Sequence, residues 1–173
     1  LIFNIVNITF HLYSLGGTMT GIILALLLVP LFSALLVFSI PNNRKELFRP
    51  IGIVFSLITF TQSMYILFSD YSKSDFQILL KFEWIQVYGL EINLGISGMS
   101  TLLLLLSSLL VLLSLLSIGK DHSESKGFIG SILTLHFAIN GVFISGDLIS
   151  LFIFFEALLI PMYFLMGIWG GDN

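Results

Sequence analysis

Apolar stretches about as long as a bilayer is thick recur along this sequence, and they constrain its fold more than any other feature. A transmembrane helix needs about 20 predominantly apolar residues. Five stretches meet this requirement, at residues 21–40, 51–69, 101–118, 128–146 and 148–170. Because hydrocarbon offers no partner to an exposed backbone polar group, such stretches cross a membrane as helices. The predicted fold class is therefore all-α and integral to the membrane, with about five transmembrane helices.

Composition supports this class and excludes several others. Hydrophobic residues make up 57% of the 173 residues and charged residues 10%, whereas a soluble domain carries about 25% charged residues. The sequence has no cysteine, which excludes disulfides and thiolate metal sites. Its net charge of -3 comes without a basic surface, so no nucleic acid is expected as a partner. We expect the lipid bilayer as a partner and no soluble domain.

The chain divides into four parts along its length. Residues 1–20 mix polar and apolar side chains, and their apolar part is too short to span a bilayer. They are expected to form a peripheral segment at the amino end or, alternatively, a poorly ordered terminus. The first two transmembrane helices lie within 21–69, a surface segment within 70–100, and the third to fifth helices within 101–171. Only Asp147 separates the last two helices, so we expect them to pack antiparallel and in contact.

The segment between the second and third helices alternates apolar and polar residues instead of following a helical period. The alternation runs from Gln77 to Trp84 and again from Leu90 to Ile96, with a glycine-containing connection between the two runs. A period of two residues indicates strands, and a short connection joins strands as a hairpin. We predict a β-hairpin that lies on the membrane surface. The alternative is one extended loop.

Positively charged residues indicate which ends of the helices face inward. Five of the seven lie in the connections at residues 41–50 and 119–127, and two lie within 70–100. Lysine and arginine accumulate on the inner side of a membrane. The two basic connections are therefore expected on the matrix or cytoplasmic side, and the hairpin on the intermembrane-space or periplasmic side. Trp84 and Trp169 are typical of anchors at the membrane interfaces.

A carboxylate lies near the middle of the last apolar stretch. Glu156 at such a depth costs about 2.5 to 3.5 kcal/mol on insertion scales, so acidic residues inside membranes usually face a partner or water. Pro161 follows five residues later; it lacks an N–H and crowds the Ala157 carbonyl, so we expect it to kink the helix. A charge beside a broken hydrogen-bond ladder suits an ion or proton path. The alternative is a neutral acid that is hydrogen-bonded to a neighbouring helix.

Two further titratable residues are site candidates. His136 lies near the middle of the fourth apolar stretch, and Asn140 follows one turn later on the same face. An imidazole can relay protons near neutral pH; the alternative is a hydrogen-bonded contact between helices. Asp147 lies between the fourth and fifth stretches, where it either caps the fifth helix or takes part in transport. The sequence has no metal-ligand spacing, phosphate-binding loop or nucleophile motif.

The carboxyl-terminal third of the sequence carries a resemblance. Residues 154–162 read Phe-Phe-Glu-Ala-Leu-Leu-Ile-Pro-Met and residues 167–170 read Gly-Ile-Trp-Gly. Weaker matches precede them at 95–100, 141–143 and 147–148. The motifs resemble the chain 4 family of antiporter-like subunits in the proton-pumping NADH:ubiquinone oxidoreductase, respiratory complex I. In that family such a glutamate pairs with a lysine on a later helix and takes part in proton translocation, so the resemblance implies this role for Glu156.

The sequence departs from the family pattern in two respects. Ser97 stands where many members have an aspartate, so a charge-dependent role at that position is not expected. The resemblance covers roughly the first third of a family member, and no lysine lies within a predicted span. We therefore expect a fragment or split-gene product, with a companion polypeptide that carries the remaining helices and the lysine partner of Glu156.

The resemblance implies a membrane-arm subunit of complex I in the mitochondrial inner membrane, with the bacterial plasma membrane as the alternative. The enzyme would be a proton-translocating NADH:ubiquinone reductase without redox chemistry on this chain. Its NADH, FMN, iron–sulfur clusters and ubiquinone would be bound by other subunits, which are the expected partners. Two other functions stay open: a subunit of a multi-subunit sodium/proton antiporter, and a structural membrane scaffold.

Overall fold

The computed structural model describes residues 17–68, 76–85, 90–119 and 125–170. Its elements in chain order are α2 (Gly17–Ser39), η1 (Asn42–Leu47), α3 (Phe48–Phe68), β1 (Gln77–Ile85), β2 (Leu90–Ile96), α4 (Gly98–Ser117), α6 (Lys126–Ile144) and α7 (Leu148–Trp169). Within the described residues, five helices are long and apolar enough to cross a membrane, as predicted. Most of the predicted amino-terminal peripheral segment, residues 1–16, lies outside the described residues.

Several helices begin a few residues earlier than the sequence predicted, for local reasons. α3 begins at Phe48 and carries Pro50 in its first turn, where a proline is tolerated because the N–H has no helical partner anyway. The predicted connection at 41–50 is therefore mostly the 3₁₀ turn η1 and the first turn of α3. α4 begins after Ser97, because Ser97 and Ser100 each accept a hydrogen bond from the other's backbone N–H, a capping box.

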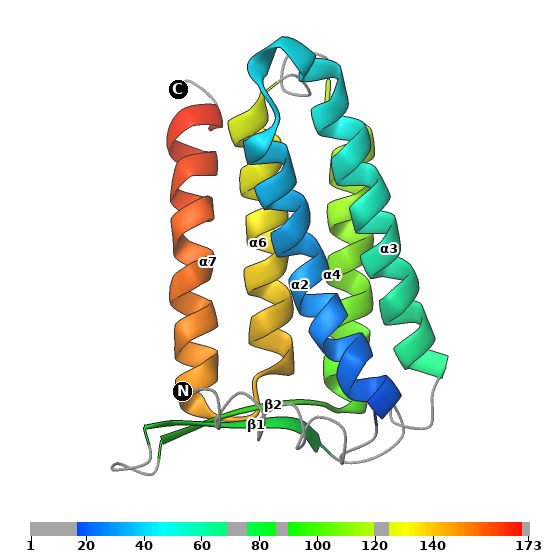
Figure 1. Ribbon diagram of the computed structural model, residues 1–173, viewed down its shortest axis with the longest axis vertical. Helices are drawn as coiled ribbons and strands as arrows, with labels where there is room; N and C mark the ends of the chain where they lie inside the picture. Colours follow the sequence, from blue (N-terminus) through cyan, green and yellow to red (C-terminus); the bar gives the residue numbers. More distant parts are fainter. Residues whose placement is uncertain (1–16, 69–75, 86–89, 120–124, 171–173) are drawn as a thin grey trace.

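The helices form a bundle with one flanking member. α2, α3, α4 and α6 pack together, and α7 lies along the outer side of α6 (Figure 1). The antiparallel contact between α6 and α7 confirms the expectation from their tight connection. The hairpin lies across the end of the bundle at which α4 and α7 begin, and η1 lies at the opposite end (Figure 1). The hairpin and the basic η1 connection are thus separated by the length of the helices, as the predicted topology requires.

β1 and β2 form an antiparallel hairpin, as predicted, and not the alternative of one extended loop. The register pairs Gln77 with Ile96 and Leu80 with Leu94, with irregularities near both ends of β1. Leu79, Leu94 and Ile96 are buried in an apolar cluster with side chains from the ends of α2, α3, α4 and α6. In β2 the alternating side chains fix one face against the bundle, because every second residue points the same way. In β1 the predicted apolar face is not the buried one: Ile78 and Phe82 are 51% and 45% exposed and Leu79 is buried, next to the register irregularity between Ile78 and Leu80.

Two basic side chains hold the helix ends at the η1 end of the bundle. Arg49 donates from Nε to the Leu115 carbonyl at 3.0 Å and from Nη2 to the Leu116 carbonyl at 2.6 Å. Lys126 donates to two carbonyls at the end of α2, at 3.1 and 3.2 Å. The last carbonyls of a helix have no partner within the helix and carry partial negative charge. These two side chains therefore cap the carboxyl ends of α4 and α2. They also contribute to the positive charge of this end of the bundle.

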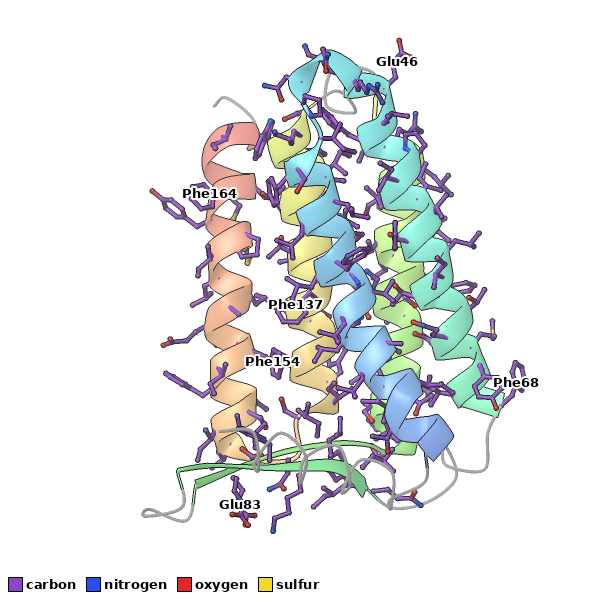
Figure 2. All side chains as sticks on the ribbon, viewed as in Figure 1. Glu46, Phe68, Glu83, Phe137, Phe154 and Phe164 are labelled. Carbon is purple, nitrogen blue, oxygen red and sulfur yellow. The ribbon has the colours of Figure 1, made fainter. Side chains whose placement is uncertain are left out.

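Aromatic rings that pack against glycines join α7 to α6. The Phe154 ring lies against Gly141, where a Cβ atom would collide with it. Phe137 on α6 meets Phe154 edge to face, with ring centroids 5.8 Å apart (Figure 2). Near the other end, Trp169 lies against Gly127, where an added Cβ would come 2.9 Å from the indole. Small residues let membrane helices approach closely, so these positions set the α6–α7 contact.

Candidate functional site

Glu156 lies on a face of α7 that the described residues leave uncovered. α7 packs against α6 and, near its first turn, against β2. Glu156 is exposed, and Phe152, Ile160 and Tyr163 are 59%, 63% and 72% exposed. Their spacing places them with Leu159 on one side of the helix. We call these five residues the open face of α7: an apolar surface with one carboxylate near its centre.

The described residues hold no ion pair for Glu156. Of their lysines, Lys81 pairs with Glu91 at 2.7 Å and Lys126 bonds to carbonyls of α2. A carboxylate at membrane depth needs a partner or water. Among the described residues, the Glu156 carboxylate on the open face has no cation beside it. The same part of the chain has no group of three His, Cys, Asp or Glu side chains that could hold a metal ion.

Pro161 lies inside α7 but on another side from Glu156. It is buried, whereas Glu156 is exposed, and α7 continues through it from Leu148 to Trp169. Because proline has no N–H, the Ala157 carbonyl lacks its usual donor in this turn. The predicted pair of charge and proline is therefore present in one helix, but the two side chains do not share a face.

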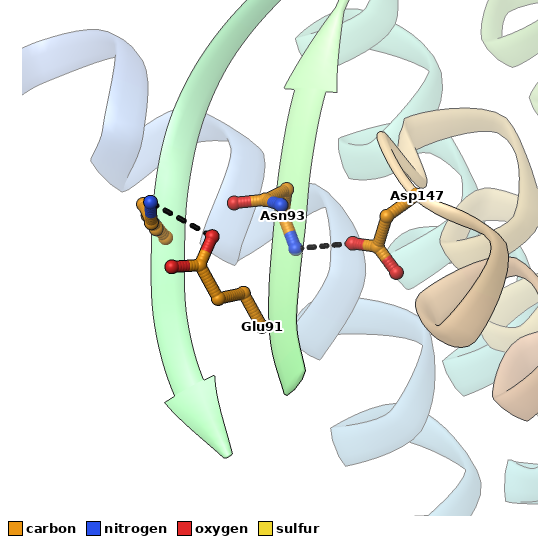
Figure 3. Close-up of polar contacts among 4 residues, drawn as sticks. Glu91, Asn93 and Asp147 are labelled. Carbon is orange, nitrogen blue, oxygen red and sulfur yellow. Dashed lines mark hydrogen bonds and ion pairs between the residues drawn. The ribbon is translucent and has the colours of Figure 1, made fainter. Parts of the chain in front are cut away.

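Asp147 caps the start of α7, which is one of the two roles that the sequence predicted for it. Its Oδ1 accepts hydrogen bonds from the backbone N–H groups of Ile149 at 2.9 Å and Ser150 at 2.8 Å. Its Oδ2 accepts from the Asn93 N–H in β2 at 2.5 Å (Figure 3). The Asn93 carbonyl in turn accepts from the Gly146 N–H at 2.7 Å. One carboxylate thus starts α7 and fastens the hairpin to the α6–α7 connection.

These hydrogen bonds hold Asp147 in its charged form. Burial raises the pKa of the Asp147 carboxyl, but hydrogen bonds from Ser150, Asn93 and Ile149 together lower it further than burial raises it. The net pKa lies below the ordinary value of 3.8, because a carboxylate accepts N–H donors better than its acid does. An ionised anchor, unlike a proton carrier, does not need to titrate near neutral pH.

His136 is fully buried near the middle of α6, and it does not make the hydrogen-bonded contact between helices that was the alternative prediction. Neither ring nitrogen has a hydrogen-bond partner among the described residues. Asn140, one turn later, makes the contact instead: its Nδ2 donates to the Leu26 carbonyl of α2 at 3.2 Å, and its Oδ1 accepts from Ser107 of α4 at 3.4 Å.

The predicted site residues are not brought together. Glu156 lies on the open face of α7, His136 inside the bundle, and Asp147 at the hairpin end. Sequence reasoning missed Asn93, the hairpin residue that Asp147 binds. No sequence signal identifies it, because the two residues are 54 positions apart and their contact exists only once the hairpin folds across the helices.

Comparisons with known proteins find relatives that are named as subunit M or chain 4 of oxidoreductases and a dehydrogenase. It is 32% identical over 152 residues to NADH-quinone oxidoreductase subunit M of Rickettsia conorii and 34% identical over 148 residues to NADH-ubiquinone oxidoreductase chain 4 of Arabidopsis thaliana. It is also 34% identical over 150 residues to F(420)H(2) dehydrogenase subunit M of Methanosarcina mazei. These alignments cover 84%, 84% and 86% of this chain. No family model matches the sequence.

A solved structure has a similar fold. A chain in respiratory complex I from Thermus thermophilus with bound NADH superimposes with a TM-score of 0.70 at 25% identity, over 87% of this chain and 30% of the other. The sequence relatives are likewise much longer, because the alignments cover 31%, 30% and 30% of their lengths. The chain therefore spans about a third of the proteins that it matches.

Proposed function

We propose that this chain, a relative of subunit M or chain 4 of the NADH-quinone oxidoreductases over 84% of its length, works as part of an antiporter-like, proton-translocating subunit in the membrane arm of such a complex. Five described helices are long and apolar enough to cross a membrane, which supports a multi-pass location. The mitochondrial inner membrane and the bacterial plasma membrane both suit it, since its relatives include a plant and a Rickettsia protein.

The names of the relatives support the proposal that electron-donor oxidation and proton movement take place on different subunits of the complex. Subunit M relatives belong to enzymes named for NADH and for F(420)H(2), so the same kind of membrane subunit accompanies different electron donors. We infer that donor oxidation, with flavin, iron–sulfur clusters and quinone reduction, takes place on other subunits. This chain would contribute the coupled movement of protons.

Glu156 would be the proton-carrying residue of this pathway, and its exposure on the open face of α7 is the observation that carries the proposal. An uncovered carboxylate in hydrocarbon is costly, so the open face calls for further protein. The two thirds of the relatives' length that this chain does not match would supply the covering helices. A lysine on them would favour the carboxylate, and withdrawal of that lysine would favour the neutral acid.

Pro161 would assist by loosening the helix next to this glutamate. The Ala157 carbonyl lacks its helical donor because of the proline and lies one residue after Glu156. A water molecule or a polar group from a covering helix would satisfy it. The companion polypeptide, or a further part of the same polypeptide, would provide that group together with the lysine.

The test replaces Glu156 by Gln in the native complex and measures quinone reduction and proton uptake in sealed membrane vesicles. Glutamine keeps the shape but cannot change charge, so we expect normal assembly with proton translocation reduced or uncoupled. Glu46→Gln is the matched control, because Glu46 is exposed in η1, outside the helices of the bundle (Figure 2). Full proton translocation by Glu156→Gln would refute the role. Sodium-dependent exchange without quinone reduction would instead support an exchanger subunit.

A further inference from the structure

A layer of polar side chains crosses the middle of the four-helix bundle. One apolar cluster lies toward the hairpin and includes Leu26, Leu104 and Ile144. A second lies toward η1 and includes Val37 and Leu133. On the described helices, no Leu, Ile, Val, Phe or Met is buried between the two clusters. The buried polar residues there, which we call the polar layer, are Ser33, Ser56, Thr59, Ser63, Ser107, Ser108, His136 and Asn140.

Hydrogen bonds of the polar layer join all four helices at this depth. Asn140 of α6 binds the Leu26 carbonyl of α2, which is free because Pro30, four residues later in α2, has no N–H to give it. Asn140 also accepts from Ser107 of α4. The adjacent Ser108 lies 3.5 Å from the Ser63 hydroxyl of α3. Two groups of hydrogen bonds thus cross the bundle, one through Asn140 and one through Ser108, and they meet at the neighbouring residues Ser107 and Ser108 of α4.

Helix packing explains most of the hydroxyl groups but not His136. Serine and threonine in membrane helices commonly bond to a carbonyl of their own helix; Ser33, Thr59 and Ser63 do so at 2.7 to 3.0 Å. His136 is 0% exposed, and both of its ring nitrogens lack a partner among the described residues. A neutral imidazole has one donor and one acceptor. Leaving both unpaired is costly, so such a group calls for a ligand.

Two more unpaired polar atoms belong to α3. The Ser56 hydroxyl and Gln62 Oε1 are buried and without a hydrogen-bond partner in the described part of the chain. Like the nitrogens of His136, they are polar atoms in the part of the bundle between the two apolar clusters. Groups of this kind bind internal water, which typically makes about three hydrogen bonds to buried polar atoms. The polar layer has one imidazole and no charged side chain, so it lacks the several carboxylate, imidazole or thiolate ligands of a divalent metal site.

We propose that the polar layer is an internal water site in which His136 carries a proton. A hydrated proton bonds to the free ring nitrogen, and the N–H of the other nitrogen then passes its proton to the next water. The imidazole ends in its other tautomer, one proton has moved across the ring, and no oxidant or reductant is involved. The site is separate from α7, which carries Glu156 and lies along the outer side of α6 (Figure 1), and it goes beyond the proposed role of that residue.

The first test asks whether water reaches His136. The full chain carrying His11→Gln and His122→Gln has one histidine left of its three. With this histidine labelled with ¹⁵N, in lipid bilayers, solid-state NMR that transfers magnetisation from water protons should give an imidazole signal, and the imidazole N–H should exchange in D₂O. An imidazole that receives no magnetisation and keeps its N–H proton, while amides of the 41–50 connection exchange in a uniformly ¹⁵N-labelled sample, would overturn the proposal.

The second test asks whether the polar layer supplies the water. Asn140→Leu removes the link to Ser107 and Leu26, and we expect N–H exchange at His136 to slow about tenfold, which corresponds to about 1.4 kcal/mol, the size of one hydrogen bond. Ser107→Ala is a milder variant in case Asn140→Leu folds poorly, and should slow exchange in the same direction. Unchanged exchange in both folded variants would overturn the proposal. Because the chain is measured alone, this result is independent of pumping through Glu156.

Discussion

Asp147 and Glu156 illustrate how the surroundings of a carboxylate decide its use. Asp147 receives three backbone N–H donors, so its charge is already satisfied and serves as an anchor. Glu156, on the same helix, has no such donor and no cation among the described residues and faces outward on α7. The first needs nothing further from the protein, whereas the second needs another protein surface. This difference separates a structural acid from a candidate transport acid.

Asp147→Ala is expected to free the hairpin and destabilise the start of α7. Loss of an acidic helix cap costs about 0.5 to 2 kcal/mol, and the Asn93 N–H also loses its acceptor. Hydrogen exchange in bilayers should show faster exchange of the Asn93 amide. Glu91→Gln is the control, because the partly exposed Lys81–Glu91 pair contributes about 0 to 1 kcal/mol. Equal protection of Asn93 in Asp147→Ala and the parent chain would contradict this account.

The same anchor should weaken in acid. The pKa of Asp147 in the folded chain lies below its ordinary value of 3.8, so its stabilisation is complete well above 3.8. It is lost as the pH falls from 3.8 through the lower folded-state pKa. Protection of the Asn93 amide, corrected with Asp147→Asn as a reference that does not titrate, should fall over that range. A loss of protection that begins near neutral pH would exclude Asp147 as its cause.

Single-residue roles could be predicted from sequence only where they are local. The capping role of Asp147 follows from an acid that directly precedes an apolar stretch. Its bond to Asn93 and the carbonyl bonds of Arg49 depend on contacts across 54 and 66 positions, which no local pattern encodes. His136 was foreseen as a candidate, but its lack of a partner depends on which side chains surround it.

At the scale of elements, the contact between α6 and α7 depends on a glycine that leaves room for an aromatic ring. A Cβ at Gly141 would collide with the Phe154 ring near its attachment, where the ring cannot easily move away. We expect Gly141→Ala to destabilise the pair by about 1 to 3 kcal/mol, the usual cost of overpacking. Unfolding in detergent would measure it. Gly167→Ala, where a Cβ meets no atom within 4 Å, is the control.

A compensating change would separate overpacking from a general effect of alanine. Phe154→Leu removes the ring that an added Cβ would meet, so Gly141→Ala should cost less in that background than in the parent chain. A double-mutant cycle measures this coupling. Equal costs in both backgrounds would mean that Phe154 is not the obstacle.

Arg49 is the second element-scale prediction, because it closes the end of α4. Arg49→Leu removes both hydrogen bonds to the last turn of α4, and we expect a loss of about 0.3 to 2 kcal/mol, the range for a cation at a helix carboxyl end. Arg44→Leu, an exposed change in η1, is the control for charge. Thermal unfolding in detergent measures both variants. An equal loss of stability in both would mean that the lost positive charge, and not the hydrogen bonds of Arg49 to α4, is responsible.

Elements were predicted better than their ends. The five spans follow from apolar length, and the hairpin follows from the period of two residues on both sides of a short connection. The starts of α3 and α4 were placed too late, because Pro50 in a first turn and the Ser97–Ser100 capping box extend each helix beyond its apolar run. Hydropathy marks the membrane-facing part of a helix, whereas capping marks where the helix begins.

At the scale of the whole molecule, the chain has an uneven distribution of contacts. The bundle of α2, α3, α4 and α6 buries its own polar layer, whereas α7 shares contacts mainly with α6 and leaves its open face uncovered. Sequence reasoning predicted that α6 and α7 would touch, but not that α7 would lie outside the bundle. That position depends on how the other four helices pack, and it fits a chain that spans about a third of its relatives' length.

The most direct test of this account is photo-crosslinking in native membranes from position 163. Tyr163 shares the open face with Glu156 and is 72% exposed, so a photoreactive residue there leaves the carboxylate intact. We predict crosslinks to a membrane segment of the quinone oxidoreductase, on the same or a companion polypeptide, and none of that kind from the exposed Val54 of α3. Crosslinks from position 163 to lipid alone, with this chain absent from the oxidoreductase complex, would contradict the account.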